Sequence, residues 1–145
     1  MTFIPRKGTD KNWKLRFYKK TGSVAFANGN LVDWPASVTG YFVAATASTT
    51  KLCGIIQKTI TSGSSDYTTN TLCPVLVPTS LDAEVIATTA GTAVATDVGG
   101  RYDLTDATTV NRAASTVGRV VMTEFISATS CVYTLLPIAQ YGAAA

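Results

Sequence analysis

The sequence predicts an all-β protein, either a small β-barrel or β-tulip or a sandwich of short antiparallel strands, with an extended N-terminal arm. Apolar residues alternate with polar ones in short runs, and turn residues separate the runs about every 8–12 positions. Threonine, which is β-branched and favours strands, occurs 24 times among the 145 residues. Between Gly22 and Pro137 no segment has a convincing amphipathic helical pattern.

The expected strands follow the alternation of apolar residues and end at glycine, proline or asparagine. Asn28 and Gly29 predict a hairpin between the first two strands, because Asn-Gly suits a tight hairpin turn. Gly54 predicts a β-bulge, and Pro74 predicts a sheet edge because proline cannot donate a ladder hydrogen bond. In chain order, the strands are expected within residues 23–27, 31–34, 38–47, 51–60, 72–77, 84–88, 92–95, 102–104, 108–111, 118–126 and 131–136.

The run at 118–126 is the longest of these strands. Strict alternation places Val121, Thr123 and Phe125 on one face of it and Val120, Met122, Glu124 and Ile126 on the other.

The bulk composition describes one folded domain. Hydrophobic residues make up 46% of the chain, which excludes a disordered protein, and charged residues only 14%. We expect a basic, aromatic arm at residues 1–20, a β domain at 21–138 and a flexible tail at 139–145.

The first twenty residues differ chemically from the rest. Residues 6–20 contain seven basic residues and one acidic residue, whereas the remainder of the chain contains five basic and eight acidic residues. This asymmetry indicates an anionic partner for the arm. The candidate partner-binding residues are Arg6, Lys7, Lys11, Trp13, Lys14, Arg16, Phe17, Tyr18, Lys19 and Lys20.

The arm is open to three interpretations. Trp13, Phe17 and Tyr18 are candidate anchors in pockets of an acidic protein surface, with the basic residues supplying electrostatic attachment. Basic residues with interleaved aromatics also bind single-stranded nucleic acid. Alternatively, the segment is a half-buried first strand, since Leu15 and Phe17 alternate with Arg16.

Residues that carry catalysis are scarce. The chain has no histidine, which excludes Ser-His-Asp and Cys-His catalysis in their usual forms. A carboxylate pair is the remaining possibility, with Asp97, Asp103, Asp106 and Glu124 as candidates, but aspartates near turns usually cap their own backbone. We expect no enzymatic activity and no cofactor.

Cys53, Cys73 and Cys131 show no Cys-x-x-Cys spacing, which argues against a disulfide framework and a zinc site and for three buried thiols. No apolar run approaches the length of a membrane span, and no signal peptide is visible. The expected site of synthesis is a reducing host cytoplasm.

Three stretches resemble the decoration, or cement, proteins of tailed-bacteriophage capsids: KLCGIIQKTITSGSSDYTTNTLCPVLVP, VGGRYDLTDATTVN and GRVVMTEFISATSCVYTLLP. The resemblance spans residues 38–137. It implies a β-barrel or β-tulip fold, a trimer on the capsid surface, the major capsid protein as partner, and a head-stabilising role. A nucleic-acid-binding coat protein and a glycan-binding tail module, with Trp34 and Tyr41 as stacking platforms, are the alternatives.

Overall fold

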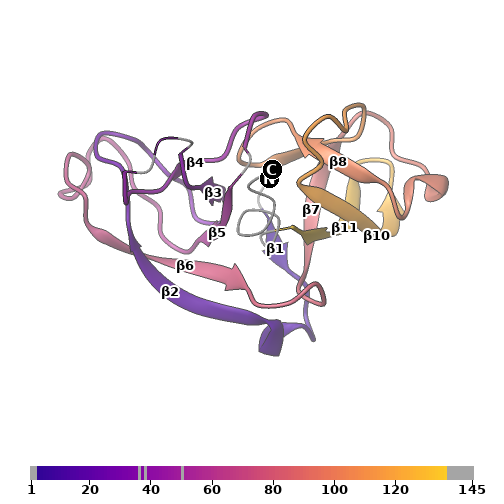
Figure 1. Ribbon diagram of the computed structural model, residues 1–145, viewed down its shortest axis with the longest axis horizontal. Coiled ribbons are helices and arrows are strands. Elements are labelled where there is room, and N and C mark those ends of the chain that lie inside the picture. The colour runs from indigo at the N-terminus through magenta and orange to yellow at the C-terminus, as the bar shows by residue number, and fades with distance from the viewer. Residues whose placement is uncertain (1–2, 36, 38, 50, 137–145) are drawn as a thin grey trace.

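The computed structural model describes residues 3–35, 37, 39–49 and 51–136, which form two β-sheets side by side (Figure 1). The first sheet contains β1 (Ile4–Pro5), β7 (Glu84–Ala90), β8 (Arg101–Leu104), β9 (Thr109–Asn111), β10 (Val120–Ser127) and β11 (Ser130–Leu135). The second contains β2 (Trp13–Lys19), β3 (Leu31–Asp33), β4 (Val43–Ala44), β5 (Leu52–Ile56) and β6 (Leu72–Pro78). The only helical turns in these ranges are 3₁₀ turns, η1 (Asp10–Asn12) and η2 (Ala95–Asp97). The all-β prediction is confirmed.

Neither 3₁₀ turn could span a bilayer: among the residues just given, no helix is long and apolar enough to cross a membrane.

A five-stranded barrel forms half of the molecule. The strands run in the order β7-β11-β10-β8-β9, and a parallel pairing of β9 with β7 closes the circle. Thr88 pairs with Thr109 and Ala90 with Asn111, so β9 takes the C-terminal half of β7. The short strand β1 pairs with Val85 and Ile86 in the other half. This closure identifies the barrel among the architectures that the sequence left open.

Strand β10 departs from the predicted alternation. Met122 pairs with Tyr133 and Glu124 with Val132, so Thr123 is an extra, bulged residue. The bulge shifts Phe125 onto the face of Met122, where it packs against the barrel core. The predicted placement of Thr123 and Phe125 on one face is therefore wrong, because a β-bulge reverses the alternation beyond it.

The second sheet has the order β2-β6-β5-β3-β4. A bridge between Lys20 and Phe42 joins the end of β2 to the chain just before β4, so the two ends of this sheet meet at one corner. In Figure 1, β2 lies on the outside of the molecule, with β6 between it and β5.

Two apolar cores hold the sheets together. The first fills the barrel and continues into the second sheet; its largest buried members are Phe3, Leu31, Leu52, Ile55, Leu104, Met122, Tyr133 and Leu135. The second lies against the other face of the second sheet and consists of Phe26, Val32, Phe42, Cys53, Ile56, Ile60, Cys73, Val75 and Val77. The first core draws on both sheets, so the barrel and the second sheet share one apolar interior.

The predicted Asn-Gly hairpin does not form. Asn28 and Gly29 make a turn, and Gly29 has the positive φ of 93° that glycine tolerates. The flanking segments pair with residues 55–60 instead of with each other, Phe26 with Ile60 and Leu31 with Ile55. Among the other expected strands, the segment 92–95 forms none, and 38–47 shortens to β4 among its described residues.

The bulge expected at Gly54 forms one residue earlier: Val32 pairs with Gly54 and Asp33 with Leu52, so Cys53 is the extra residue. The prediction for Pro74 is wrong, since β6 lies between β2 and β5. Pro74 is tolerated there because its missing N–H would point toward β5, which ends at Ile56.

Residues 3–20 are built into the two sheets, which differs from the expected arm and from a domain boundary at residue 20. Phe3 is buried in the first core and donates its N–H to the Gly29 carbonyl. Strand β2 pairs with β6 over all seven of its residues, so the alternative of a first strand is confirmed, but Leu15 and Phe17, its expected buried face, are exposed. The predicted tail at 139–145 lies outside the described residues.

Gly54→Ala is expected to destabilise the protein by about 3 kcal/mol, because overpacking forces backbone shifts. A Cβ on Gly54 would lie 2.3 Å from the Leu76 carbonyl oxygen and 2.9 Å from Val75 Cγ1. The matched control is Gly63→Ala, whose Cβ would meet only Thr61 Oγ1, at 3.9 Å. Urea unfolding measures both; equal stabilities would contradict the close approach of β5 and β6.

Asp33→Asn is expected to stabilise the protein at neutral pH. Burial raises the pKa of Asp33 from 3.8 to about 6, against a hydrogen bond with Thr49, and Oδ1 has no hydrogen-bond partner within the described chain. The folded protein therefore favours the neutral form of Asp33. The free energy of unfolding decreases as pH rises from about 4 through 6, because the buried carboxyl group then loses its proton. The loss is about 3 kcal/mol.

Urea unfolding of both proteins between pH 4 and pH 8 measures this difference. The two stabilities are expected to converge near pH 4 and to separate above pH 6. Parallel pH profiles would show that Asp33 does not titrate in this range.

Candidate docking surface

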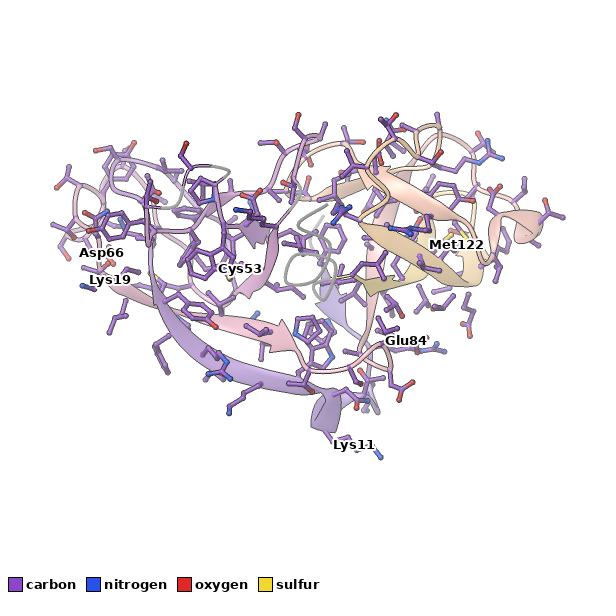
Figure 2. The ribbon with its side chains drawn as sticks, in the orientation of Figure 1. Lys11, Lys19, Cys53, Asp66, Glu84 and Met122 are labelled. Atoms are coloured by element: carbon purple, nitrogen blue, oxygen red, sulfur yellow. The ribbon has the colours of Figure 1, made fainter. Side chains whose placement is uncertain are left out.

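Strand β2 and the turn before it present a row of unpaired cations. We call Lys7, Lys11, Lys14, Arg16 and Lys19 the basic row; all five side chains are exposed. None of them makes an ion pair with another described residue. Figure 2 shows Lys11 pointing away from the body below one end of β2 and labels Lys19 at the other end. The row is therefore available to an anionic partner.

Apolar side chains lie on one face of the same strand. Leu15 is 51% exposed, Phe17 is 59% exposed, and Leu72 on β6 is 57% exposed. Leu15 pairs with Leu76, Phe17 with Pro74 and Lys19 with Leu72, which puts these side chains on a common face. We call Leu15, Phe17 and Leu72 the apolar ladder. Exposed large side chains in a contiguous row indicate an interaction surface.

The outer edge of β2 also carries unpaired backbone groups. Lys20 donates its N–H to Thr71 O beyond the end of β6, whereas Lys19 O accepts from the Phe42 N–H on the opposite side. Because successive residues of a strand point their backbone groups to opposite sides, Trp13, Leu15 and Phe17 direct theirs away from β6. Among the residues that the structure describes, both ends of this edge are occupied: the Trp13 N–H donates to Asp10 O, and Lys19 O accepts from Phe42. Leu15 and Phe17 between them carry the open backbone groups.

Two of the predicted anchors, Trp13 and Tyr18, pack against the apolar cores of the protein itself. Trp13 packs against the first core and donates its Nε1–H to Thr9 Oγ1 at 3.2 Å. Tyr18 packs on the second core, with its ring edge-on to Trp34 at a centroid distance of 5.0 Å. Phe17 alone of the three aromatic candidates is exposed.

Arg6 is part of an intramolecular ion-pair network. Its guanidinium contacts Glu84 Oε1 at 3.2 Å and Glu124 Oε1 at 3.1 Å. The hydrogen bond and charge of Glu124, followed by the charge of Glu84, raise the pKa of Arg6. These contacts tie the end of β1 to β7 and β10, so the charge of Arg6 has intramolecular partners that the sequence did not predict.

Lys20 is fully buried, which corrects its assignment as a partner-binding residue. Its ammonium donates to the carbonyl oxygens of Tyr67 at 3.0 Å, Thr69 at 2.6 Å and Thr21 at 3.5 Å. Asn70 Nδ2 in turn donates to the Lys20 carbonyl. The charge of Lys20 therefore fastens the loop between β5 and β6 to the end of β2. Period-2 alternation alone gave no signal for this burial.

The four candidate catalytic carboxylates serve local structure. Arg112 holds Asp97 through two hydrogen bonds of 2.8 and 3.0 Å and lowers its pKa. Asp103 accepts three backbone N–H groups from the loop before β10, at 2.6–3.1 Å. Asp106 caps the next turn, and Glu124 binds Arg6 as described above. No group of three metal-ligating side chains occurs in the described ranges.

The remaining candidates are also packed. Trp34 is half-buried against the second core, and Tyr41 is half-buried in the preceding loop region of β4. The prediction of three buried free cysteines is confirmed. Burial raises the pKa of Cys53 to about 12.

Lys20→Met is expected to destabilise the protein by about 3 kcal/mol, because removal of a buried donor leaves its acceptors unsatisfied. The matched control is Lys19→Met, which removes an exposed ammonium from the adjacent position and is expected to change stability by less than about 0.5 kcal/mol. Thermal and urea unfolding measure both variants. Equal effects at the two positions would contradict a stabilising role for the hydrogen bonds from Lys20 Nζ to the three carbonyl oxygens.

Comparison of the chain with protein-family models and with curated proteins finds no match. The assignment of a function therefore depends on the geometry of β2.

Proposed function

We propose that the protein is a non-enzymatic structural protein that binds the outer surface of a tailed-phage capsid and clamps neighbouring major capsid subunits. The observation that supports this proposal is the coincidence, on strand β2, of an unpaired basic row, an apolar ladder and an open backbone edge. The resemblance of residues 38–137 to decoration proteins supplies the class of partner.

The chemistry of β2 suits docking onto an acidic protein surface. Long-range attraction between the basic row and acidic residues accelerates encounter and makes it sensitive to salt. The apolar ladder then contributes area that is removed from water on contact; a stable interface needs on the order of 1,200–2,000 Å² in total. β2 supplies only part of that area, so the proposal includes a homo-oligomer, with a trimer favoured, that binds several capsid subunits at once.

Binding to nucleic acid is the second candidate, and the basic row favours it. Binding of single strands also needs exposed aromatic rings on which bases stack. Trp13 and Tyr18 are partly buried against the two cores, which leaves Phe17 as the exposed ring of β2. A glycan-binding tail module has weaker support, since Trp34 is packed against Tyr18.

Lys14→Glu is expected to lower binding to heads that lack the protein by at least about tenfold, equivalent to about 1.4 kcal/mol. The control is Lys51→Glu, which makes the same charge change just before β5 and is expected to bind like the original protein. Co-sedimentation with purified heads, with bound copies counted at saturation, measures both.

Saturation at a fixed multiple of the major capsid subunit would support the capsid role. Absence of co-sedimentation at low and moderate salt would overturn it. Oligonucleotide binding with a steep loss of affinity as salt rises would then favour the nucleic-acid candidate.

A further inference from the structure

Strand β2 is the end strand of its sheet, and its outer edge pairs with no other strand of the described chain. The strand has seven residues, and Leu15 and Phe17 point N–H and C=O groups outward from it, between the Trp13 N–H bonded to Asp10 O and the Lys19 carbonyl bonded to Phe42. Open edges of this length pair readily with other chains, and proteins usually shorten, twist or cover them. Here the strand keeps its full length and pairs with β6 at every position, without a register shift.

The side chains beside this edge alternate in chemistry. Leu15 and Phe17 of the apolar ladder lie on one face, and Lys14 and Arg16 lie on the other. An edge that was only being protected from aggregation would need the charges and would not need two large exposed apolar groups, at 51% and 59% exposure. The pattern matches a strand partner that is apolar on one face and acidic on the other.

A second copy of this chain does not meet that requirement. In a β2–β2 pair, Lys14 and Arg16 would face cations of the other copy, and like charges across paired strands are destabilising. Acidic residues at the facing positions would instead form cross-strand ion pairs with both cations.

We propose that β2 accepts an extended acidic segment of its partner protein as an added β-strand, with acidic side chains opposite Lys14 and Arg16 and apolar side chains opposite Leu15 and Phe17. This inference rests on the proposed docking function of the same strand and assigns its mode of binding. Main-chain hydrogen bonds supply the pairing, and the alternating side chains supply the specificity.

The main test uses Leu15→Pro with Leu15→Ala as its matched control. Proline at 15 removes an N–H that points away from β6, so the ladder with β6 keeps all its donors; the alanine variant loses the same side chain and keeps the N–H. The probe is a capped peptide of about nine residues that alternates glutamate with valine, long enough to lie along one strand. Fluorescence anisotropy is expected to show binding at least tenfold weaker for Leu15→Pro than for Leu15→Ala.

If Leu15→Pro fails to fold, binding of modified peptides to the unaltered protein tests strand addition. Two peptides are N-methylated, one on its valines and the other on its glutamates. Only alternate amides of a strand face its neighbour, so one of the two is expected to lose binding to the unaltered protein and the other to retain it. A peptide with lysine in place of glutamate is expected not to bind. Equal binding by both N-methylated peptides would overturn strand addition.

Amide hydrogen exchange gives an independent readout. In the protein alone, the amides of Leu15 and Phe17 are expected to exchange rapidly and those of Arg16 and Tyr18 slowly, because the latter pair faces β6. Addition of the glutamate–valine peptide is expected to slow Leu15 and Phe17 selectively. Peptide binding without this protection would overturn the proposal.

Head binding separates this inference from the proposed function. If heads bind Leu15→Pro and Leu15→Ala equally while Lys14→Glu binds weakly, β2 docks through side chains and strand addition is wrong. If the peptide binds with the expected protection and heads do not bind, the strand site stands and its partner is not the capsid.

Discussion

The paired register of β6 is the constraint on which the rest of the structure depends. One edge of β6 carries β2, and the other meets β5 so closely that only glycine fits at position 54. Its buried residues Val75 and Val77 line the second core, while Leu76 packs against the first. A shift of β6 by one residue would turn its apolar side chains outward and move the outer face of β2 with them. The proposed docking surface is thus positioned by the interior of the protein.

The end of the open edge is set by a buried charge. Lys20 follows β2 directly, and its ammonium donates hydrogen bonds to two carbonyl oxygens of the loop between β5 and β6. The same residue bridges to Phe42, which covers the edge at this point. The five cations of the basic row are exposed, whereas Lys20 is buried. Residues of the same charge therefore have different surroundings: Lys20 binds carbonyl oxygens inside the protein, and the others face solvent.

The sequence predicted what local alternation determines and missed what distant contacts determine. The all-β class, the barrel option, a bulge within one residue of Gly54 and most strand positions followed from period-2 patterns and turn residues. The high charge of the N-terminal segment predicted a projecting arm, in spite of the alternation of Leu15 and Phe17. That alternation belongs to a strand whose partner, β6, lies about sixty residues later in the chain. Within the candidate site, the exposed basic row was predictable, whereas the burial of Lys20 and the ion pairs of Arg6 required the fold.

The long-range closure of the first strands has a consequence for how the protein is made. Arg6 contacts Glu124, 118 residues later in the chain, and β1 pairs with β7. The ribosome therefore releases β1 and β2 well before their partners exist, and loop-closure entropy must be overcome before those pairings form. Chains with such non-local pairing fold in about milliseconds to seconds. During that interval the charges of Lys14, Arg16 and Lys19 disfavour pairing between nascent β2 strands, so the residues of the proposed docking surface also suit a gatekeeper role in folding.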